Sequence, residues 1–175
     1  MDKCSNDLKL LVQQAKKGST SAFSALYEEI HMDLYRFALY IMKRPQDAED
    51  AVSDAVIIAF EKMKSLKKPE AFKNWMFQIL ANCCRKRLKT QERIEAIQEA
   101  VEEGKAASPE ISVSLWEALN QLTDEERMII ALAVLGGYKS NEIGEQLGIP
   151  AATVRSKQHR GLQKMKAFLG EEDEA

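Results

Sequence analysis

Apolar side chains recur every three or four positions along almost the whole chain, and this spacing restricts the fold more than any other feature. Leu8, Leu11, Val12 and Ala15 form one such stripe, and comparable stripes follow up to the C-terminal region. Side chains at these intervals lie on one face of an α-helix. No convincing stretch alternates apolar and polar residues between turn residues, as a half-buried strand would. The sequence therefore predicts an all-α fold.

Capping residues, glycines and prolines delimit the helices of the N-terminal half. The predicted helices run from Ser5 or Asn6 to Gly18, from Ser19 or Thr20 to just before Pro45, from Gln46 or Asp47 to the loop SLKKPE, and through residues 72–89. The second of these is predicted as one long helix. The fourth has a polar face that becomes cationic toward its C-terminal end, formed by Asn74, Gln78, Asn82, Arg85 and Lys89.

A weak apolar pattern with dense acidic residues separates the two halves of the chain. It contains Gly104 and Pro109 and is predicted to be a linker, whose first half can continue as a helix. We therefore expect two small helical domains joined by an acidic linker. The predicted boundaries are 1–90 for the first domain, 91–112 for the linker, 113–170 for the second domain and 171–175 for an acidic tail.

The charges are unevenly distributed, although the formal net charge is only −2. Residues 62–93 carry 10 Lys and Arg against 2 acidic residues, and residues 139–166 carry 6 against 2. Between them, residues 94–126 carry 9 acidic residues against 1 basic residue. Two separate contacts with a polyanion are the natural hypothesis. The alternative is that these Lys and Arg residues only keep exposed helix faces soluble. Sequence motifs are needed to distinguish the two interpretations.

The segment from Tyr138 onward has the residues that a helix-turn-helix requires. Ile143 and Leu147 face the core, Gly148 suits a left-handed turn, and Pro150 suits the start of the second helix, which Val154 anchors. The exposed side of that second helix is rich in hydrogen-bond donors and cations, as contacts with phosphates and base edges require. The predicted DNA-binding residues are Thr153, Arg155, Ser156, Lys157, His159, Arg160 and Lys164.

Several other functional classes lack support. Cys4, Cys83 and Cys84 do not have the spacing of a zinc site, so we expect reduced thiols, no metal and no cofactor. The longest apolar run, residues 128–135, is far shorter than the roughly 20 residues of a membrane-spanning helix, and no secretory signal is visible. We therefore expect no membrane insertion and a cytoplasmic location. Motifs of hydrolases and phosphate-binding enzymes are missing, so we expect a protein that is not an enzyme.

Three blocks of sequence, in order, resemble a known family. LxxLTDEERMIIAL followed by GGYKSNEIGEQLGIPAATVRSKQHRGLQKM is similar to the fourth conserved region of bacterial sigma factors of the extracytoplasmic-function (ECF) class. FSALYEEIHMDLYRFA, DAEDAVSDAVIIAFEKM and FKNWMFQILANCCRKRL resemble the second conserved region of the same family. The sequence departs from the usual pattern at Gly144, where Ala is frequent, at Lys157, where Arg is usual, and at the Cys83–Cys84 pair.

The resemblance implies roles for particular residues. The block DAEDAVSDA would dock on core RNA polymerase, which makes Asp47, Glu49, Asp50 and Asp54 candidates for polymerase binding, although Asp47 is equally explained as a helix cap. The loop at 65–71 and the helix after it would hold the opened minus-ten promoter strand. The candidates for that contact are Lys67, Lys68, Lys73, Asn74, Asn82, Arg85 and Lys86. The helix-turn-helix set would read the minus-thirty-five element. Phe72, Trp75 and Phe77 are assigned to the core rather than to base stacking.

The favoured function is therefore an alternative sigma factor that directs core RNA polymerase to specific promoters and aids DNA opening, in a stress or envelope response. The resemblance also implies control by an anti-sigma factor. The runner-up is a dimeric helix-turn-helix regulator that binds a palindromic operator without polymerase. A hydrolase or transferase and a purely structural adaptor rank lower. Cys83 and Cys84, beside a basic cluster, are assigned to helix packing, with oxidation sensing as the alternative.

Overall fold

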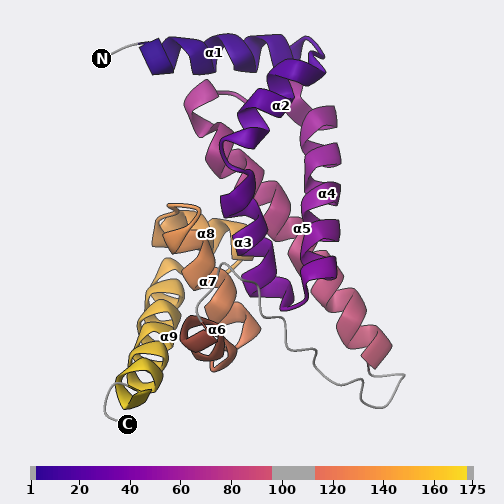
Figure 1. Cartoon of the computed structure of the whole chain (residues 1–175). Helices are drawn as coiled ribbons and strands as arrows, with labels where there is room; N and C mark the ends of the chain where they lie inside the picture. The colour runs from indigo at the N-terminus through magenta and orange to yellow at the C-terminus, as the bar shows by residue number, and fades with distance from the viewer. Residues whose placement is uncertain (1–2, 96–112, 173–175) are drawn as a thin grey trace.

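The computed structural model describes residues 3–95 and 113–172, and these residues form helices with no β-strand, as the spacing predicts (Figure 1). In the N-terminal domain the elements are α1 Lys3–Lys16, α2 Thr20–Glu28, α3 His31–Met42, α4 Pro45–Lys62, the 3₁₀ turns η1 Met63–Ser65 and η2 Pro69–Ala71, and α5 Phe72–Glu95. In the C-terminal domain they are α6 Val113–Asn120, α7 Asp124–Val134, α8 Ser140–Leu147 and α9 Ala151–Glu172.

Three helices, α3, α4 and α5, form the centre of the N-terminal domain, and α1 lies across one end of it (Figure 1). The rings of Phe37 and Phe77 meet edge to face in this centre, with centroids 5.5 Å apart and both side chains fully buried. Small residues on α4, among them Ala51, Ala55 and Ala59, are completely buried. Because their side chains are short, α4 can approach its neighbours closely. This packing fixes the relative positions of the α4 and α5 surfaces.

The prediction of one long helix over residues 20–44 is wrong, because the chain breaks between α2 and α3. Ile30 departs from helical geometry with φ −123° and ψ −3°, and the imidazole of His31 donates a hydrogen bond of 2.7 Å to the carbonyl of Glu28. That carbonyl would otherwise accept a hydrogen bond within a continuous helix. The apolar stripe continues through the break, since Leu26, Ile30 and Leu34 are all buried. Periodicity alone therefore could not reveal it.

Two helix boundaries in the N-terminal domain differ slightly from the sequence expectation. Helix α4 begins at Pro45, whose ring suits the first helical position. Helix α5 continues to Glu95, so the start of the predicted linker is helical. Residues 96–112 of that linker and residues 173–175 of the predicted acidic tail lie outside the described residues. Within the described ranges no helix combines the length and apolar character needed to cross a membrane.

The C-terminal domain is organised around the start of α7. Thr123 and Glu126, in the sequence TDEE, form a capping box, in which each side chain accepts a hydrogen bond from the backbone N–H of the other residue. Arg127, the next residue, is buried, and its guanidinium donates to the carbonyls of Leu119 and Leu122 at 3.2 and 2.8 Å. These carbonyls lie at the end of α6 and just beyond it. Arg127 thus joins α7 to the end of α6 and to the turn that follows it.

Helices α8 and α9 form the predicted helix-turn-helix. Gly148 ends α8 in the left-handed conformation with φ 71°, as expected from its position. The N–H of Ile149 donates to the carbonyl of Gly144 at 3.0 Å, which closes the turn. Ile143 and Val154 are completely buried on the two sides of it. The turn therefore sets the angle at which α9 leaves the domain.

Two glycines in this unit allow a matched test of the packing. A Cβ added at Gly144 would lie 2.6 Å from the backbone oxygen of Ile149, whereas one at Gly161 would lie 2.8 Å from Cδ1 of Ile130, the flexible end of a side chain. Alanine gains about 1 kcal/mol over glycine inside a helix. We expect Gly161→Ala to raise the free energy of unfolding by up to about 1 kcal/mol. We expect Gly144→Ala to lower it by about 1 to 2 kcal/mol, because overpacking against rigid backbone outweighs the helix gain.

Urea denaturation of both variants followed by circular dichroism measures this difference. Equal stability of the two variants would contradict the close approach of α8 to the turn.

Candidate nucleic-acid and protein interfaces

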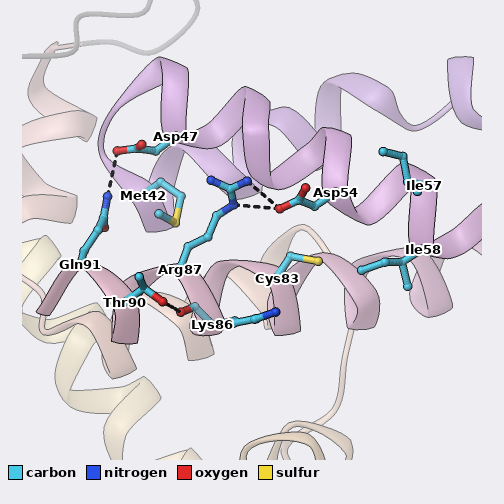
Figure 2. A pocket seen from close by; sticks show the side chains of 10 residues that line it. All are labelled: Met42, Asp47, Asp54, Ile57, Ile58, Cys83, Lys86, Arg87, Thr90 and Gln91. Atoms are coloured by element: carbon cyan, nitrogen blue, oxygen red, sulfur yellow. Dashed lines mark hydrogen bonds and ion pairs between the residues drawn. The ribbon is translucent and has the colours of Figure 1, made fainter. Parts of the chain in front are cut away.

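A pocket of about 450 Å³ lies between α4 and α5 on the surface of the N-terminal domain (Figure 2). The guanidinium of Arg87 lies in it and bonds to Asp54 at 2.6 and 3.1 Å and to Asp50 at 3.4 Å. At the same edge, the amide of Gln91 donates to Asp47 at 3.0 Å. Polar contacts from α5 therefore hold three of the four carboxylates that the sequence assigned to polymerase binding.

The contacts with α5 leave a large part of the acidic surface of α4 accessible. The side chains of Asp50 and Asp54 are 58% and 50% exposed, and Glu49 is also exposed. Ile57, one turn beyond Asp54, has 59% of its surface exposed. Charged side chains next to an exposed apolar one are typical of a surface that receives a complementary protein. Asp47 is more enclosed, at 23% side-chain exposure, which fits its alternative interpretation as a capping residue.

Arg87 was not among the residues singled out from the sequence. A weak signal for it exists, because Leu80, Cys84, Arg87 and Gln91 follow one another at helical spacing. The buried face of α5 therefore continues with two polar residues, which need polar partners on the neighbouring helix. The partner of Arg87 is Asp54, which lies 33 residues away in the sequence. The spacing of residues within α5 cannot identify such a distant partner.

The residues predicted to hold the minus-ten strand separate into two groups. The first group is exposed. Two of its members lie in the loop between the 3₁₀ turns η1 and η2, and two lie on α5. They are Lys67, Lys68, Asn82 and Lys86. Leu66, at the start of the loop, is buried and anchors it to the core. This arrangement presents a cationic loop next to a cationic helix, which suits the backbone of a single strand.

The second group makes contacts within the protein. The ammonium of Lys73 forms an ion pair of 2.8 Å with a carboxylate of α3. The backbone carbonyl of Asn74 accepts a hydrogen bond from the hydroxyl of Tyr138, and the guanidinium of Arg85 donates to the carbonyl of Gln146 at 3.0 Å. Tyr138 and Gln146 belong to the C-terminal domain. Part of the predicted minus-ten surface is therefore in contact with the other domain.

The aromatic residues at the start of α5 pack as the sequence predicted. Phe72 and Phe77 are buried, and Phe72 lies edge to face with Phe23 at 6.2 Å between centroids. Trp75 is half-buried and tilted against Phe72. The two phenylalanines form part of the core, and their rings are not available to stack on bases.

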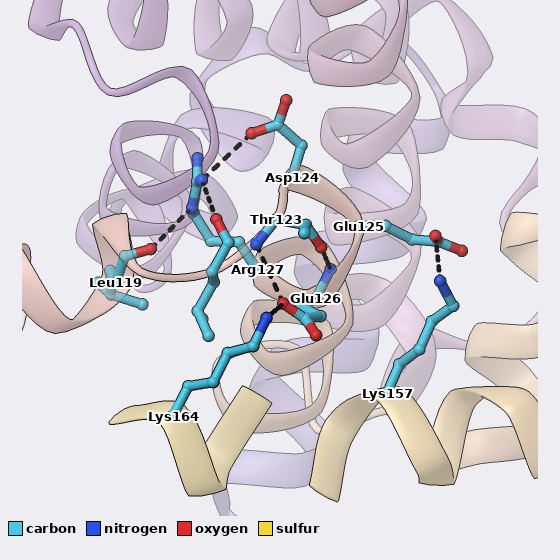
Figure 3. A network of polar contacts seen from close by, with 9 residues as sticks. Leu119, Thr123, Asp124, Glu125, Glu126, Arg127, Lys157 and Lys164 are labelled. Atoms are coloured by element: carbon cyan, nitrogen blue, oxygen red, sulfur yellow. Dashed lines mark hydrogen bonds and ion pairs between the residues drawn. The ribbon is translucent and has the colours of Figure 1, made fainter. Parts of the chain in front are cut away.

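The predicted minus-thirty-five set on α9 also separates into two faces. The outward face carries Arg155, Ser156, His159 and Arg160. Thr153 is half-buried near the start of the helix. Lys157 points back toward α7, where its ammonium lies 2.5 Å from a carboxylate oxygen of Glu125, with 25% of its side chain exposed (Figure 3). The outward face is the part of α9 that a major groove can receive.

Lys164 forms the more enclosed of the two contacts with α7 (Figure 3). Its ammonium lies 2.8 Å from a carboxylate oxygen of Glu126, a residue with only 5% of its surface exposed. The hydrogen bond from Lys164 lowers the pKa of Glu126 below its ordinary value, although burial acts in the opposite direction. The same carboxylate accepts the backbone N–H of Thr123. Lys164 therefore connects α9 to the capping box of α7 and contributes to the structure of the domain.

Cys83 and Cys84 are both buried in α5. Burial raises the pKa of the Cys83 thiol, and the carboxylate of Asp54 acts in the same direction. Burial raises the pKa of Cys84 to about 12. Neighbouring cations such as Arg87 lower both values, as the oxidation-sensing alternative requires, but their effect is smaller than that of burial. The geometry therefore favours helix packing over redox sensing.

We expect both thiols to react slowly in the folded protein. A pKa of about 12 makes the thiolate fraction of Cys84 at pH 8 on the order of a thousandfold smaller than that of an ordinary thiol. Iodoacetamide labelling of a Cys4→Ser variant, followed by mass spectrometry, measures this directly. Labelling of the native protein should be at least about tenfold slower than in urea. Equally fast labelling in both states would restore the redox interpretation.

Two family models match the chain in the order in which the surfaces occur. Sigma-70 region 2 matches residues 26–94, which includes the α4 and α5 surfaces. Sigma-70 region 4 matches residues 112–165, which includes the helix-turn-helix. Together the two matches cover most of the chain.

Individual sigma factors are also similar to most of this chain. RNA polymerase sigma factor SigV of Bacillus subtilis is 29% identical over 162 residues, which covers 90% of this chain and 98% of SigV. ECF RNA polymerase sigma factor SigM of Mycobacterium tuberculosis is 26% identical over 158 residues, covering 87% of this chain and 80% of SigM.

Solved structures share the fold. The sigma factor RpoE of Bartonella quintana, in complex with the anti-sigma factor NepR, superimposes with a TM-score of 0.72 at 22% identity and covers 83% of this chain and 97% of that chain. CnrH, in complex with the cytosolic domain of CnrY, gives a TM-score of 0.65 at 23% identity, with coverage of 94% and 97%. From the order of the family regions, the relatives and the fold, the chain belongs to the sigma-70 family and is a sigma factor of the extracytoplasmic-function class.

Proposed function

We propose that this sigma factor directs core RNA polymerase to promoters through three surfaces, one on α4, one on α5 with its preceding loop, and one on α9. The observation that carries the proposal is the ordered match to sigma-70 regions 2 and 4, each of which contains a charged helix surface. Sigma factors are transcription initiation factors, and we assign no catalytic residue to the chain. Its contribution to DNA opening would come from binding the opened strand.

The surface on α4 is assigned to the polymerase. Asp50 and Asp54 support this because each is about half exposed while Arg87 fixes its orientation. A carboxylate that is already oriented loses little conformational freedom when a basic partner binds. The exposed side chain of Ile57 adds apolar area beside the charges. Glu49 extends the acidic strip, whereas Asp47 contributes mainly to the helix start.

The two DNA surfaces are assigned by position and charge. Lys67, Lys68, Asn82 and Lys86 would receive the opened minus-ten strand. Arg155, Ser156, His159 and Arg160 would enter the major groove of the minus-thirty-five element. Each contact would be weak alone, and tethering both to one polymerase would strengthen them together.

Binding measurements separate this function from that of a dimeric helix-turn-helix regulator. A sigma factor is expected to bind an asymmetric promoter only together with core polymerase, because the free chain has a net charge of −2 and weak DNA contacts. A dimeric regulator binds a palindromic site without polymerase. Footprinting on genomic promoter fragments with and without core polymerase distinguishes the two. Protection of a symmetric site by the free protein would overturn the sigma assignment for these surfaces.

Control by an anti-sigma factor is part of the proposal. Its support is the shared fold with RpoE and CnrH, whose solved structures contain NepR and the cytosolic domain of CnrY. Co-purification of the chain from its host, followed by mass spectrometry, tests for such an inhibitor. A role in a stress or envelope response stays a prediction of the family resemblance.

A further inference from the structure

Helix α1 packs against the loop that carries part of the predicted minus-ten site. It lies across the end of the N-terminal domain at which the chain passes from α4 to α5 (Figure 1). Its packing partners include α2 and both 3₁₀ turns, η1 and η2, between which Lys67 and Lys68 lie. The match to sigma-70 region 2 begins at residue 26, so it includes this loop but not α1. The family match therefore assigns no role to α1, although α1 packs against both ends of the loop.

The inward face of α1 belongs to the same core as the two ends of the loop. Val12 and Ala15 have only 1% and 2% of their surface exposed. They belong to one buried cluster with Met63 of η1 and with Leu66, the residue that follows η1. Because buried side chains are closely packed, a change in the position of α1 alters the support of both turns.

Backbone hydrogen bonds close each of the two turns separately. The N–H of Leu66 donates to the carbonyl of Met63 at 3.2 Å and closes η1. The N–H of Ala71 donates to the carbonyl of Lys68 at 3.1 Å and closes η2. Neither hydrogen bond joins η1 to η2. The relative position of the turns, and with it that of the exposed Lys67 and Lys68, therefore depends on the elements packed against both turns.

The connection to α2 fixes α1 in this position. The N–H of Ser19, the residue before α2, donates to the carbonyl of Gln14 in α1 at 3.1 Å. Phe23 of α2 then meets Phe60 of α4 and Phe72 of α5 edge to face, at 5.4 and 6.2 Å between ring centroids. The unit formed by α1 and α2 thus contacts the helix before the loop, both turns of the loop, and the helix after it.

A second contact of α1 with the loop lies at the surface. The ammonium of Lys9 lies 4.0 Å from a carboxylate oxygen of Glu70 in η2, and the two side chains are 50% and 59% exposed. An ion pair with this exposure contributes little to stability. Glu70, however, lies two residues from Lys68 and would repel the phosphates of a strand bound there. Lys9 therefore offsets a negative charge beside the cationic loop.

We propose that α1 is a positioning element for minus-ten recognition, because its packing on both 3₁₀ turns sets the position of Lys67 and Lys68 and thereby the discrimination between minus-ten sequences. This inference rests on the proposed role of the loop in binding the opened strand. Contacts with the strand backbone set the register in which bases meet neighbouring side chains such as Asn82. A loop held in place also loses less conformational freedom when the strand binds. Val12 acts on the loop from the core and Lys9 acts on it from the surface.

The test uses the holoenzyme assembled from the full-length chain and core polymerase. A promoter recovered by run-off transcription with the unmodified chain is randomised in its minus-ten element. The preference ratio is the transcription from the favoured sequences divided by the average over the library. A smaller folded fraction lowers transcription from every sequence alike and leaves this ratio unchanged. The ratio therefore separates a positioning role of α1 from a loss of stability.

Val12→Ala removes buried packing of α1, and we expect the preference ratio to fall roughly three- to tenfold, the size expected from the loss of a few buried methyl contacts. The matched control is Val52→Ala, the same change at a buried position of α4 that lies about 16 Å from η1 along the helix. It should lower thermal stability and leave the ratio unchanged. Anisotropy of labelled sigma factor should show the same affinity for core polymerase in both variants, because the acidic strip of α4 is unchanged.

A charge swap tests the surface contact. Lys9→Glu places two like charges together at η2 and should lower the preference ratio by up to about fivefold. Adding Glu70→Lys re-forms an ion pair of opposite polarity and should restore the ratio. If Lys9 instead contacted DNA directly, the second change would not restore the ratio, because position 9 stays negative.

Equal preference ratios for Val12→Ala, Val52→Ala and the unmodified chain would overturn the positioning role of α1. If circular dichroism shows that Val12→Ala is unfolded, Lys9→Glu decides. An unchanged ratio in that variant, or a ratio that Glu70→Lys does not restore, then overturns the inference. If the unmodified holoenzyme initiates transcription but has no minus-ten preference, the proposed role of the loop is wrong, and the inference fails with it.

Discussion

Asp54→Arg is expected to abolish transcription by preventing the sigma factor from binding core polymerase. Asp54 lies at the C-terminal end of the exposed acidic strip of α4, next to the exposed Ile57, and its side chain is half exposed. The loss of a charge pair at a protein interface costs about 2 to 5 kcal/mol, which is at least about thirtyfold in affinity, and a reversed charge adds repulsion. Fluorescence anisotropy of labelled sigma factor titrated with core polymerase measures the loss.

A charge swap distinguishes docking from a structural role of the same carboxylate. Asp54 also bonds to Arg87 inside the protein, so Asp54→Arg places two like charges together in the pocket. The double variant Asp54→Arg with Arg87→Asp restores an internal pair of opposite sign. We expect the double variant to regain thermal stability and still fail to bind polymerase. Recovery of binding in the double variant would show that Asp54 acts only by joining α4 to α5.

Arg155→Glu is expected to remove promoter-specific transcription while polymerase binding stays intact. Arg155 is exposed on the outward face of α9, near the end that follows the helix-turn-helix turn. One bidentate contact with a base or a phosphate is worth about 1 to 3 kcal/mol, so its loss weakens promoter binding by roughly five- to 150-fold, and the new negative charge adds to this. Footprinting with the assembled holoenzyme measures promoter binding.

The matched control is Lys164→Met on the same helix. Lys164 is held by the buried carboxylate of Glu126, so its loss should lower the stability of the C-terminal domain and leave promoter selection unchanged. If Lys164→Met alters the promoter preference and Arg155→Glu does not, the assignment of the outward face of α9 is wrong.

Local chemistry made the helix-turn-helix and the α7 cap predictable. The left-handed turn at Gly148 and the capping box of Thr123 and Glu126 each depend on residues within a few positions of one another. Their geometry follows from short-range sterics and hydrogen bonding, which a sequence displays directly. The all-α fold is predictable for the same reason, because helical spacing is a local property.

The break between α2 and α3 was not predictable from spacing. Ile30 keeps its place in the buried stripe on both sides of the break, so the apolar pattern continues without interruption. The decisive contact is the hydrogen bond from His31 to the carbonyl of Glu28. A single side-chain contact of this kind leaves no periodic signal.

The sequence predicted each candidate site as a set of residues of suitable type. The structure shows which members of each set face solvent and which form contacts within the protein. Lys157 and Lys164 carry the same charge as Arg155 and Arg160 of the same predicted set, but they face Glu125 and Glu126 on α7. Arg87 and the adjacent Lys86 are both cations, but Arg87 faces Asp54 on α4 while Lys86 is exposed. Contacts between residues more than 30 positions apart decide these roles, and one sequence does not record them.

The contact between the two domains was also not predictable from the sequence. The sequence predicts two small domains joined by an acidic linker, whereas Leu132 of the C-terminal domain and Phe37 of the N-terminal domain belong to one buried core cluster. The sequence of α7 is apolar on more than one face, with Met128, Ile129 and Leu132 all buried. That excess of apolar surface is the physical reason for the contact, since α8 and α9 cover only part of it.

Run-off transcription with purified core RNA polymerase on a library of promoter fragments tests the central claim most directly. The account predicts transcripts that depend on this protein, that start from asymmetric promoters, and that disappear with Asp54→Arg and with Arg155→Glu. No polymerase-dependent transcript, together with tight binding of the free protein to a symmetric DNA site, would contradict it.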